Sequence, residues 1–567
     1  MARIASVFAV ASALIMGIPA HAERGAHGQV NILYWQAPSN LNPYLSAGAK
    51  DVEAAGLMLE PLARYDESGQ MIPWLARAIP TLENGGISAD LTRITWQLRD
   101  GLTWSDGSPV TAQDVQFTHA YCTAPEGGCS QRDKFRDVVS VTATGTQSVV
   151  VEFARPKPFP YNPFVGAQSP ILQRAQFSDC MGARAPTCAE ANFAPIGTGP
   201  FVVDEFRPGD VAVFSANPNY RIPDRPGFAR AVIKGGGGAT SAARAVLETG
   251  EFDYAWNLQL APEVLHDMQQ GGQGVVVTAF GTLVERLAIN FTDPDPDLGE
   301  TRATRAHPHP ILADPAVRRA LSMAIDRALL VEVGYGVSGR PSCNIVPAPA
   351  IHASRANETC LQQDIAAANA LLESAGWVDS DGDTIRERDG QQLRLLLQTS
   401  TNAVRQDFQA MLKHWWAQIG IDTELRNIEP SVFFGGDAAS PDTMQRFYAD
   451  LELYAGNFDG TDPESYLAGW ACDQAPTPQN QWQGPNVGRW CDPAYEALIA
   501  KLAVTGGEDA RAAIARAMND MLVQDGVILP LVDRGRVSAH ANSLGGVRIN
   551  AWDSELWNIA DWYRRGE

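Results

Sequence analysis

Two runs of sequence decide the fold of this chain: EPLARYDESGQMIPWLARAIP at residues 60–80 and ITWQLRDGLTWSDGSPVTAQDVQFT at residues 94–118. Residues 95–98 (TWQL) alternate polar and apolar side chains, which predicts a half-buried strand. Asp106 and Gly107 predict a turn. Thr111 predicts the start of a helix, because its hydroxyl can accept a hydrogen bond from the first free N–H groups. None of these features is catalytic, so the segment specifies a scaffold and the function must come from the rest of the chain.

Length and composition indicate a soluble globular protein with more than one domain. The 567 residues are too many for one hydrophobic core and favour two or three domains. The hydrophobic fraction of 45% and the charged fraction of 19% are typical of soluble proteins. The net charge of −21 argues against nucleic-acid binding, because neutralising phosphates needs clustered Lys and Arg.

The first 22 residues predict a secretory signal peptide. Arg3 provides the positive start, residues 4–18 are an apolar run, and residues 20–22 (AHA) form a cleavage site. The apolar run is too short to span a bilayer as a mature helix. Cys122 is the first cysteine, so the lipoprotein route is closed. We therefore expect an exported protein without its own membrane anchor, located in the periplasm of a double-membrane bacterium.

The eight cysteines also favour export. They fall into four close couples, and loop-closure entropy favours bonds across short loops, although eight cysteines allow 105 connectivities. The rival interpretation is a metal site, but the chain has no C-x-x-C and no His between close cysteines. We expect four local disulfides. The couples are Cys122–Cys129, Cys180–Cys188, Cys343–Cys360 and Cys472–Cys491.

The apolar periodicity predicts a mixture of strands and helices. A strand at 229–234, a helix at 241–248 and a strand at 253–256 form a βαβ unit, which implies a parallel sheet. Pro208 and Gly209 join two alternating runs into a hairpin. Asp314 and Pro315 start a helix whose apolar stripe extends to Leu329. Further helices are expected at 366–375, 404–419, 494–504 and 509–524, and further strands at 30–35, 393–398, 422–427 and 527–531.

Motifs for catalysis are missing from the sequence. The chain has no G-x-S-x-G, H-E-x-x-H or G-x-x-x-x-G-K. One metal-like pattern stands at Asp379, Asp381, Asp383 and Glu387, where oxygen ligands alternate around a glycine as calcium prefers. The glycine and the glutamate come too early for an EF-hand. We favour a solvated acidic turn, with a structural Ca²⁺ site as the alternative, and expect no other cofactor.

Several motifs together resemble the peptide/nickel class (family 5) of extracytoplasmic solute-binding proteins of bacterial ABC importers. They are the opening stretch, GTGP at 197–200, NPNY at 217–220 and DPAVRRALSMAIDRALL at 314–330. The resemblance covers nearly the whole mature chain. It implies an α/β, periplasmic-binding-protein-like fold of type II, in the large three-lobed variety, with two ligand-enclosing lobes and an extra lobe. Lobe I would comprise residues 23–60, 196–300 and 529–567, lobe II residues 61–195, and lobe III residues 301–528.

The resemblance also implies ligand-binding residues. Asp459, after Phe458, occupies the place where peptide-binding relatives hold an Asp for the ligand's α-ammonium. Its carboxylate could form charge-assisted hydrogen bonds in a closed cleft; the alternative is a residue that caps a turn. Thr399 occupies the place where dipeptide-specific relatives have an Arg for the ligand carboxylate, which favours a longer or an uncharged ligand. The segment around Arg489 resembles the disulfide-bearing segment of dipeptide-binding relatives and supports the Cys472–Cys491 bond.

Aromatic residues supply the remaining candidates. Trp256 and Asn257 end a strand of the βαβ unit, where open sheets present ligands. Trp470 lies in a segment expected near the cleft, and its ring could stack on a ligand. Tyr34, Trp35 and Asn42 are weaker candidates from the first strand and its loop. Core packing is the alternative for most of these side chains.

These features together predict a non-catalytic capture protein for an ABC importer. We expect a monomer that encloses a peptide, more specifically an oligopeptide, by hinge closure and then docks on membrane permease subunits served by cytoplasmic ATPases. An oligosaccharide, an opine or a metal chelate is the alternative ligand on the same scaffold. An exported hydrolase is the alternative from another class, and it requires a catalytic site that the sequence does not reveal.

Overall fold

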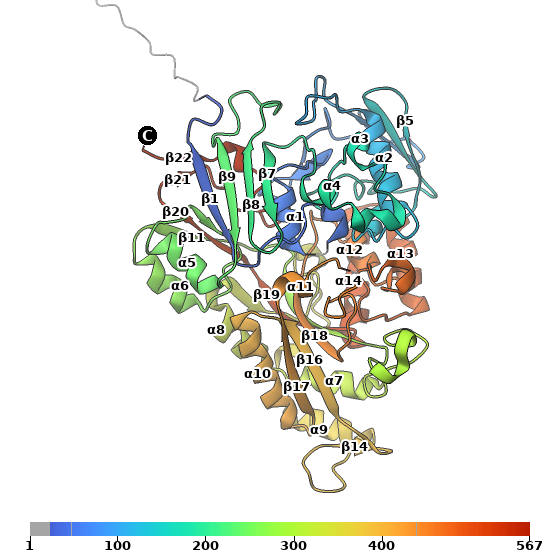
Figure 1. The fold of residues 1–567 in the computed structure, drawn as a ribbon. Helices are drawn as coiled ribbons and strands as arrows, with labels where there is room; N and C mark the ends of the chain where they lie inside the picture. The colour runs from blue at the N-terminus through green and yellow to red at the C-terminus, as the bar shows by residue number, and fades with distance from the viewer. Residues whose placement is uncertain (1–22, 47, 438, 567) are drawn as a thin grey trace, which may run out of the picture.

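The computed structural model of the protein describes residues 23–46, 48–437 and 439–566. The predicted signal peptide lies outside the described residues. Figure 1 shows an upper part, which holds both β1 and the C-terminal strand β22, and a lower part built from the middle of the chain. The lobes expected from the sequence are recognisable in this arrangement, so we keep their names.

Lobe I is built on a seven-stranded sheet in the order β11-β20-β10-β1-β9-β8-β7. β1 pairs in parallel with both β9 and β10, which α5 connects, so the predicted βαβ unit is confirmed with β1 between its two strands. The hairpin at Pro208 and Gly209 is confirmed as well. The strands are β1 (Gln29–Tyr34), β7 (Phe201–Arg207), β8 (Val211–Ala216), β9 (Arg230–Gly235), β10 (Tyr254–Ala255), β11 (Gly274–Ala279) and β20 (Arg536–Ala541). The accompanying elements are α1 (Ala49–Ala55), α5 (Ala239–Leu247), α6 (Pro262–Gln269), β21 (Leu544–Gly545) and β22 (Tyr563–Arg564).

Lobe II is the smaller addition beside lobe I, drawn in lighter blue and teal in Figure 1. Its three-stranded sheet has the order β4-β6-β5, and β4 confirms the strand predicted at residues 95–98. Thr111 caps α2 in a reciprocal arrangement with Asp114, as its position before the helix predicted. The elements are β2 (Ala63–Tyr65), β3 (Met71–Pro73), β4 (Arg93–Gln97), α2 (Ala112–Thr123), η2 (Arg132–Phe135), β5 (Val138–Ala143), β6 (Ser148–Phe153), α3 (Arg174–Phe177) and α4 (Ala189–Phe193).

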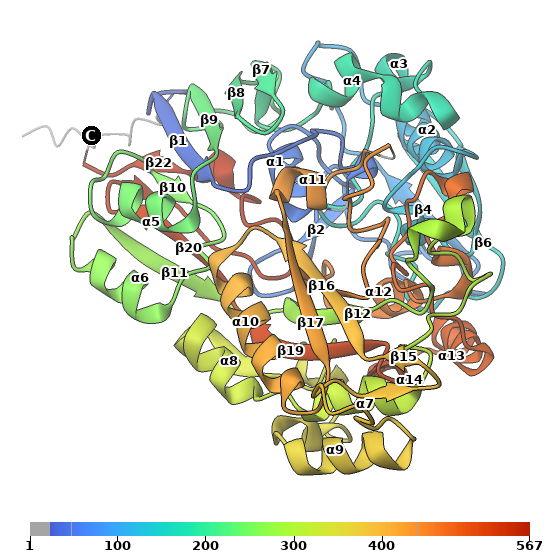
Figure 2. The same cartoon turned by 60° about the horizontal axis from the view of Figure 1, so that its bottom comes forward.

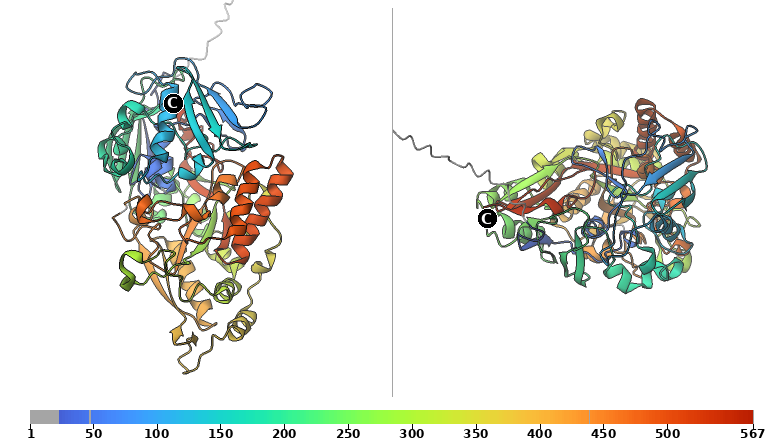
Figure 3. Two further views of the ribbon diagram at one scale, coloured as in Figure 1. Left: turned by 90° about the vertical axis from the view of Figure 1, so that its right-hand side faces the viewer. Right: turned by 90° about the horizontal axis from the view of Figure 1, so that it is seen from above.

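Lobe III contains a six-stranded sheet in the order β13-β19-β12-β18-β16-β17, covered on both faces. Leu287 of β12 packs in the core under α7 to α10, whereas the next residue, Ala288, packs in the core under α12 to α14. Figure 2 shows α8 and α10 beside the sheet, and Figure 3 shows the orange-red pair α13 and α14 on the outside of the lobe. The strands are β12 (Val284–Ile289), β13 (Gly339–Pro341), β14 (Glu387–Arg388), β15 (Gln391–Gln392), β16 (Arg394–Ser400), β17 (Asp422–Ile428), β18 (Leu451–Gly456) and β19 (Ile528–Arg534). The helices are α7 (Pro315–Met323), α8 (Arg327–Gly334), α9 (Ile365–Ser374), α10 (Ala403–Ala417), α11 (Pro430–Phe433), α12 (Glu464–Ala468), α13 (Pro493–Val504) and α14 (Glu508–Gln524).

The two large sheets are joined by two short connections within the described chain. β11 of lobe I leads into β12 of lobe III through residues 280–283, and β19 of lobe III leads into β20 of lobe I through Gly535. These connections correct the expected lobe boundaries at 300 and 528, because β12 and β19 both pair inside the lobe III sheet. Two adjacent connections of this kind form a hinge.

One predicted helix is divided in two. The apolar stripe beginning at Val317 was expected to continue to Leu329, but α7 ends at Met323 and Asp326 caps a second helix, α8. The Asp326 carboxylate accepts a hydrogen bond from the Leu329 N–H, and the Leu329 side chain is exposed. The helical period was therefore right for residues 315–323, and the capping signal inside the run was missed.

The four disulfides expected from the cysteine spacing are all formed. They join Cys122–Cys129, Cys180–Cys188, Cys343–Cys360 and Cys472–Cys491. Among the described residues no helix has the length and apolar character that crossing a membrane requires.

Candidate ligand-binding site

A cavity of about 230 Å³ lies where the three lobes meet. Its walls combine polar groups from the beginning, the middle and the end of the chain. Lobe I contributes Gln36, Lys50, Glu53, Trp256, Asn257, Arg536 and Glu555. Lobe II contributes Ser130, Gln131, Asp133, Lys134 and Gln168. Lobe III contributes, among others, Arg286, Arg405, Phe434, Met444, Gln445, Tyr454, Phe458, Ser465, Tyr466 and Arg534.

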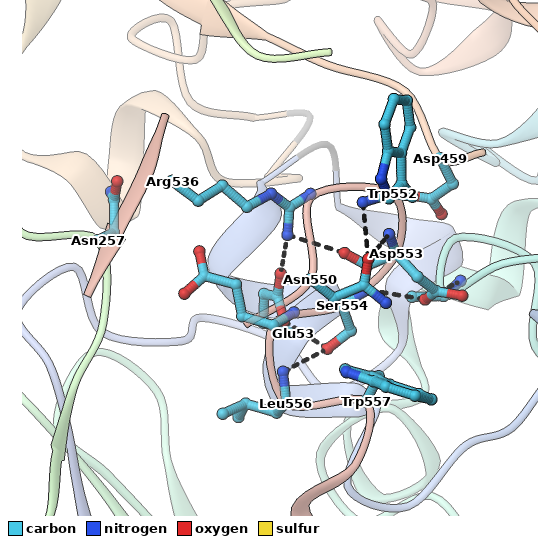
Figure 4. A network of polar contacts seen from close by, with 12 residues as sticks. Glu53, Asn257, Asp459, Arg536, Asn550, Trp552, Asp553, Ser554, Leu556 and Trp557 are labelled. Carbon is cyan, nitrogen blue, oxygen red and sulfur yellow. Dashed lines mark hydrogen bonds and ion pairs between the residues drawn. The ribbon is translucent and has the colours of Figure 1, made fainter. Parts of the chain in front are cut away.

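The lobe I wall is organised around the ion pair of Glu53 and Arg536. Arg536 Nη1 donates to Glu53 Oε1 at 3.0 Å and to the Asp553 carbonyl at 2.8 Å (Figure 4). The other Glu53 oxygen accepts hydrogen bonds from the Ser554 hydroxyl and from the Glu555 N–H. Burial raises the pKa of Glu53 to about 7, although the Arg536 guanidinium acts in the opposite direction. The C-terminal segment 553–555 thus fixes two cavity charges that come from α1 and β20.

Two buried donors of lobe I have no hydrogen-bond partner among the residues that the structure describes. They are the indole Nε1 of Trp256 and the side-chain Nε2 of Gln36, and both residues line the cavity. The Trp256 ring stacks on Tyr34 with a centroid distance of 4.6 Å, so its orientation is fixed by packing. Buried polar atoms normally have partners, so unpaired donors on a cavity wall are suited to acceptors of a ligand.

Glu285 holds two of the cavity arginines at the hinge. Its Oε1 accepts hydrogen bonds from Arg405 at 3.0 Å and from Arg534 at 2.9 Å, and also from the Tyr335 hydroxyl. Burial alone would raise the pKa of Glu285, but the two guanidinium groups lower it overall. The carboxylate therefore stays ionised and keeps both arginines oriented along the cavity wall.

Arg286, the next residue, has aromatic surroundings and no ion pair. Its guanidinium lies 5.1 Å from the ring centroid of Tyr454, 5.6 Å from that of Tyr466 and 5.3 Å from that of Trp470. Among the described residues its oxygen contacts are the hydroxyls of Tyr466 and Tyr454. Gly456 provides the space, because a Cβ at this position would lie 2.3 Å from the Arg286 Cζ.

Lobe II closes the cavity opposite lobe III. Asp133 of η2 accepts a hydrogen bond from the Ser465 hydroxyl at 2.7 Å, and the Ser130 hydroxyl donates to Gln483 at 2.9 Å. Lys134 is 7% exposed and presents its ammonium group from the same short helix. Because these contacts cross between lobes, the structure represents a closed arrangement around the cavity.

Comparison with known proteins identifies the family. The model of "Bacterial extracellular solute-binding proteins, family 5 Middle" matches residues 70–477. The chain belongs to this family. The α/β, periplasmic-binding-protein-like fold of type II that the sequence predicted is confirmed.

Relatives of this family 5 protein have different names. This chain is 28% identical to Protein XP55 of Streptomyces lividans over 468 residues, which cover 79% of this chain and 77% of Protein XP55. It is 25% identical over 408 residues to the nickel-binding periplasmic protein of Escherichia coli, which covers 70% of each chain. It is 23% identical to the periplasmic murein peptide-binding protein MppA of Escherichia coli over 518 residues, 87% of this chain and 85% of the other. The solved MppA structure gives a TM-score of 0.77 and covers 95% of this chain and 99% of that one, at 20% identity.

Three residues expected at the site line the cavity of this family 5 protein. They are Trp256, Asn257 and Phe458. The positive φ of Asn257, 54°, turns the chain directly after the short strand β10, and the Asn257 side chain donates to Gln36 at 3.2 Å. Phe458 stacks on Tyr466 with a centroid distance of 5.0 Å. The rule that strands of a βαβ unit end at the ligand site thus located the lobe I wall.

Asp459 lies behind the cavity wall. Its carboxylate accepts a hydrogen bond at 3.1 Å from the backbone N–H of Gln168, and Gln168 itself lines the cavity. Figure 4 shows Asp459 beside Trp552 and Asp553, away from the ion pair of Glu53 and Arg536. Burial, followed by the charge of Asp553, raises the pKa of Asp459 to about 6. The ammonium-binding role expected for Asp459 stays a prediction, and the cavity-facing carboxylates come from other residues.

Thr399 is also absent from the cavity wall. Its hydroxyl donates to the Leu453 carbonyl at 2.5 Å between β16 and β18, and the residue is fully buried. Strand β16 continues to Ser400, and the arginine that reaches the cavity from this region is Arg405 on α10. The position matched by resemblance is therefore part of the sheet in this protein.

The other aromatic and polar candidates support the site from outside. Tyr34 carries the Trp256 ring, and the Trp35 indole donates to the Asn257 carbonyl at 2.9 Å. Trp470 packs edge-on against Tyr466. Asn42 is buried away from the cavity, where its side chain donates to Tyr121 and Asn192. These residues fix the wall residues by packing and do not line the cavity.

The acidic loop lies at the lower tip of lobe III, near β14 in Figure 1 and far from the cavity. Carboxylate oxygens of Asp379, Asp381 and Glu387 lie within 4.8 Å of one another. Asp383 is not part of this group, and its carboxylate accepts hydrogen bonds from the Ile385 N–H and from Gln392. A calcium ion in this loop stays a prediction, with three candidate ligands in place of four.

The charged residues of the cavity were missed from the sequence. They are Lys50, Glu53, Asp133, Lys134, Arg286, Arg405, Arg534, Arg536 and Glu555. Two signals could have located some of them. Glu285 and Arg286 interrupt an otherwise apolar strand (VERLAI), and Arg534 and Arg536 flank Gly535 at the end of another strand. Charges placed inside buried strands need partners or a function.

Proposed function

We propose that this protein captures a short peptide in the three-lobe cavity and delivers it to the permease of an ABC importer. The observation that carries the proposal is the cavity itself, whose walls come from three lobes joined at a two-connection hinge. Membership in the family of extracellular solute-binding proteins supports the same function. Ligand contacts to both sides of such a cavity favour the closed state over the open state.

The cavity volume favours a short ligand. At about 230 Å³ it is smaller than the roughly 300–1,000 Å³ of pockets that enclose drug-sized molecules. The oligopeptide expected from the sequence stays a prediction, since this volume describes the cavity of the closed arrangement alone. Unpaired donors on the wall and aromatic faces at Trp256, Tyr454 and Phe458 suit the carbonyls and side chains of a peptide. An oligosaccharide, an opine or a metal chelate is not better supported than a peptide, although one relative is named as nickel-binding.

Location and partners are part of the proposal. Two of the relatives described above are periplasmic by name. Four disulfides suit an oxidising compartment, and the predicted signal peptide provides a route of export. The closed form would dock on membrane permease subunits served by cytoplasmic ATPases, and the protein would act without catalytic turnover.

Native mass spectrometry of protein purified from the producing cells tests the proposal. We expect a bound species with the mass of a di- or tripeptide, which unfolding releases and resupply restores. Incubation with the same peptides should leave them intact. Hydrolysis products would show an enzyme in place of a capture protein, and failure of the protein to bind any di- or tripeptide would refute the proposed function.

A further inference from the structure

We propose that Arg286 is the receptor for a carboxylate of the ligand, and that the cavity therefore selects carboxylate-bearing peptides. The proposal rests on the proposed function in one respect, namely that the cavity is the ligand site. It assigns a specificity-determining role to a residue of β12 that packs beside the hinge.

The first argument is the missing counter-ion. Arg286 is 6% exposed, and among residues 23–46, 48–437 and 439–566 it forms no ion pair. The other arginines and Lys50 of the cavity wall have acidic partners: Lys50 has Asp51, Arg405 and Arg534 share Glu285, and Arg536 has Glu53. A buried cation without a counter-ion is costly to the fold, so its retention indicates that a ligand supplies the charge.

The neighbouring carboxylate cannot supply this charge. Glu285 precedes Arg286 on β12, and successive side chains of a strand point to opposite faces of the sheet. The contacts agree, because Glu285 binds Arg405, Arg534 and Tyr335, whereas Arg286 contacts Tyr454, Tyr466 and Trp470. The two residues share no partner among these contacts.

The second argument is the geometry of the guanidinium. Tyr466 accepts the hydrogen bond of Nη1, and no group in the described part of the chain accepts a hydrogen bond from the buried Nε. The edge that contains Nε is one of the two edges with which a guanidinium binds a carboxylate through parallel hydrogen bonds. The surrounding rings hold the group in place through their faces, and they leave this edge for the ligand.

The third argument is that free donors outnumber free acceptors on the wall, where Gln445 Oε1 is the one buried acceptor without a partner among the described residues. Lys134 forms no ion pair within the described part of the chain, and the buried nitrogens of Trp256 and Gln36 are unpaired donors. By contrast, the cavity carboxylates are already engaged: Glu53 binds Arg536, Asp133 binds Ser465, and Glu555 binds Tyr254 and Ser538. Although the net charge of the protein is −21, the cavity wall presents unpaired hydrogen-bond donors and two cations, Arg286 and Lys134, to a ligand.

Binding of two matched peptide libraries tests the inference. The first is an equimolar library of tripeptides with free carboxyl termini, and the second contains the same tripeptides as C-terminal amides. We expect the wild-type protein to bind the free-acid library and to lose at least about 30-fold in affinity for the amides, measured by calorimetry. Amides that still bind only when they contain Asp or Glu would show that Arg286 receives a side-chain carboxylate, which also supports the inference.

Variants separate the role of Arg286 from folding. Arg286→Gln should weaken binding of the free-acid library at least about 30-fold, and Arg286→Lys should restore part of it. Arg394→Gln is the control, because Arg394 lies on β16 of the same sheet and its side chain is exposed. Thermal unfolding checks that all variants fold; if Arg286→Gln does not, the comparison of acids with amides on the wild type decides alone.

The outcomes distinguish this inference from the proposed function. Equal affinity of the wild type for free-acid and amidated peptides without Asp or Glu would overturn the role of Arg286 and leave peptide capture intact. Unchanged binding by a folded Arg286→Gln variant would do the same. If the wild type bound neither library, the proposed function and this inference would both be wrong.

Discussion

Replacement of Lys157 by Met is expected to weaken ligand binding by opening the lobes. Lys157 of lobe II contacts Glu464 of lobe III, and Glu464 also accepts a hydrogen bond from Arg511 at 2.8 Å. The side chains of Lys157 and Glu464 are 2% and 4% exposed, so the ion pair is buried. The pair forms across the two lobes, and its loss therefore raises the free energy of the closed form. Lys157 also contacts Asp137 inside lobe II at 3.4 Å, and that contact is lost from the open and the closed form alike.

The structure gives the size of this effect. Removing one partner of a buried pair costs about 3–5 kcal/mol when the other charge is left alone. Glu464 keeps Arg511, so we expect a smaller cost, about 2 kcal/mol. That energy corresponds to roughly a 30-fold shift of the equilibrium from closed to open, and to a similar loss of apparent affinity.

Calorimetry and X-ray scattering measure the two consequences. The Lys157→Met variant should bind the ligand identified by native mass spectrometry about 30-fold more weakly, and its radius of gyration without ligand should be larger than that of the wild type. Arg155→Met is the matched control, because Arg155 pairs with Asp137 inside lobe II at 2.7 Å. If Lys157→Met bound as tightly as the control and scattered identically, the buried pair would not contribute to closure.

Three further predictions concern single groups. Trp256→Phe keeps a stacked ring but removes the unpaired Nε1, so affinity should fall about fivefold without loss of thermal stability, and equal affinity would exclude a hydrogen bond to the ligand. Thr399→Val should lower the free energy of unfolding by about 1 kcal/mol, because the hydrogen bond to the Leu453 carbonyl is lost, and should leave ligand affinity unchanged. Weaker ligand binding by this variant would indicate that Thr399 contacts the ligand. Burial raises the pKa of Asp533 to about 6, although the charge of Arg340 acts in the opposite direction. Between about pH 4 and pH 6 the folded state therefore holds a proton that the unfolded state has lost, and the wild type loses stability as the pH rises through this range. Asp533→Asn should therefore be more stable than the wild type by roughly 2–3 kcal/mol in denaturant unfolding at pH 8 and equal to it at pH 4, and a constant difference across this range would contradict the shift.

Local signals allowed much of the fold to be predicted. Thr111 and Asp314 cap helices as their positions indicate, and Gly376 has the positive φ expected after α9. The lobe boundary at residue 300 was wrong because the pairing of β12 with β18 and β19 depends on strands far away in the sequence. Pairing over such distances leaves little trace in local periodicity.

The site was predictable in part for the same reason. Trp256 and Asn257 lie at the end of a strand of a βαβ unit, and both line the cavity as this topological rule indicated; their contact with a ligand stays a prediction. Glu53 carries no comparable signal, and the only signal for Arg286 is a charge inside an otherwise apolar strand, because the importance of both residues comes from burial and from the partners that the fold provides. Thr399, the position matched through resemblance, lies in the sheet and not on the cavity wall, and its contact with a ligand stays a prediction. Local sequence does not reveal whether a side chain at the end of a strand joins the sheet or faces a cavity.

The cavity combines Glu53 near the start of the chain, Trp256 and Arg286 in its middle, and Arg536 and Glu555 close to its end. A polypeptide still emerging from the ribosome has no complete wall, because β20 and the segment that orients Glu53 are synthesised last. A ligand therefore cannot find the complete wall before the last segment of the chain has been synthesised. The site is thus completed only when the C-terminal segment has joined residues from the start and the middle of the chain.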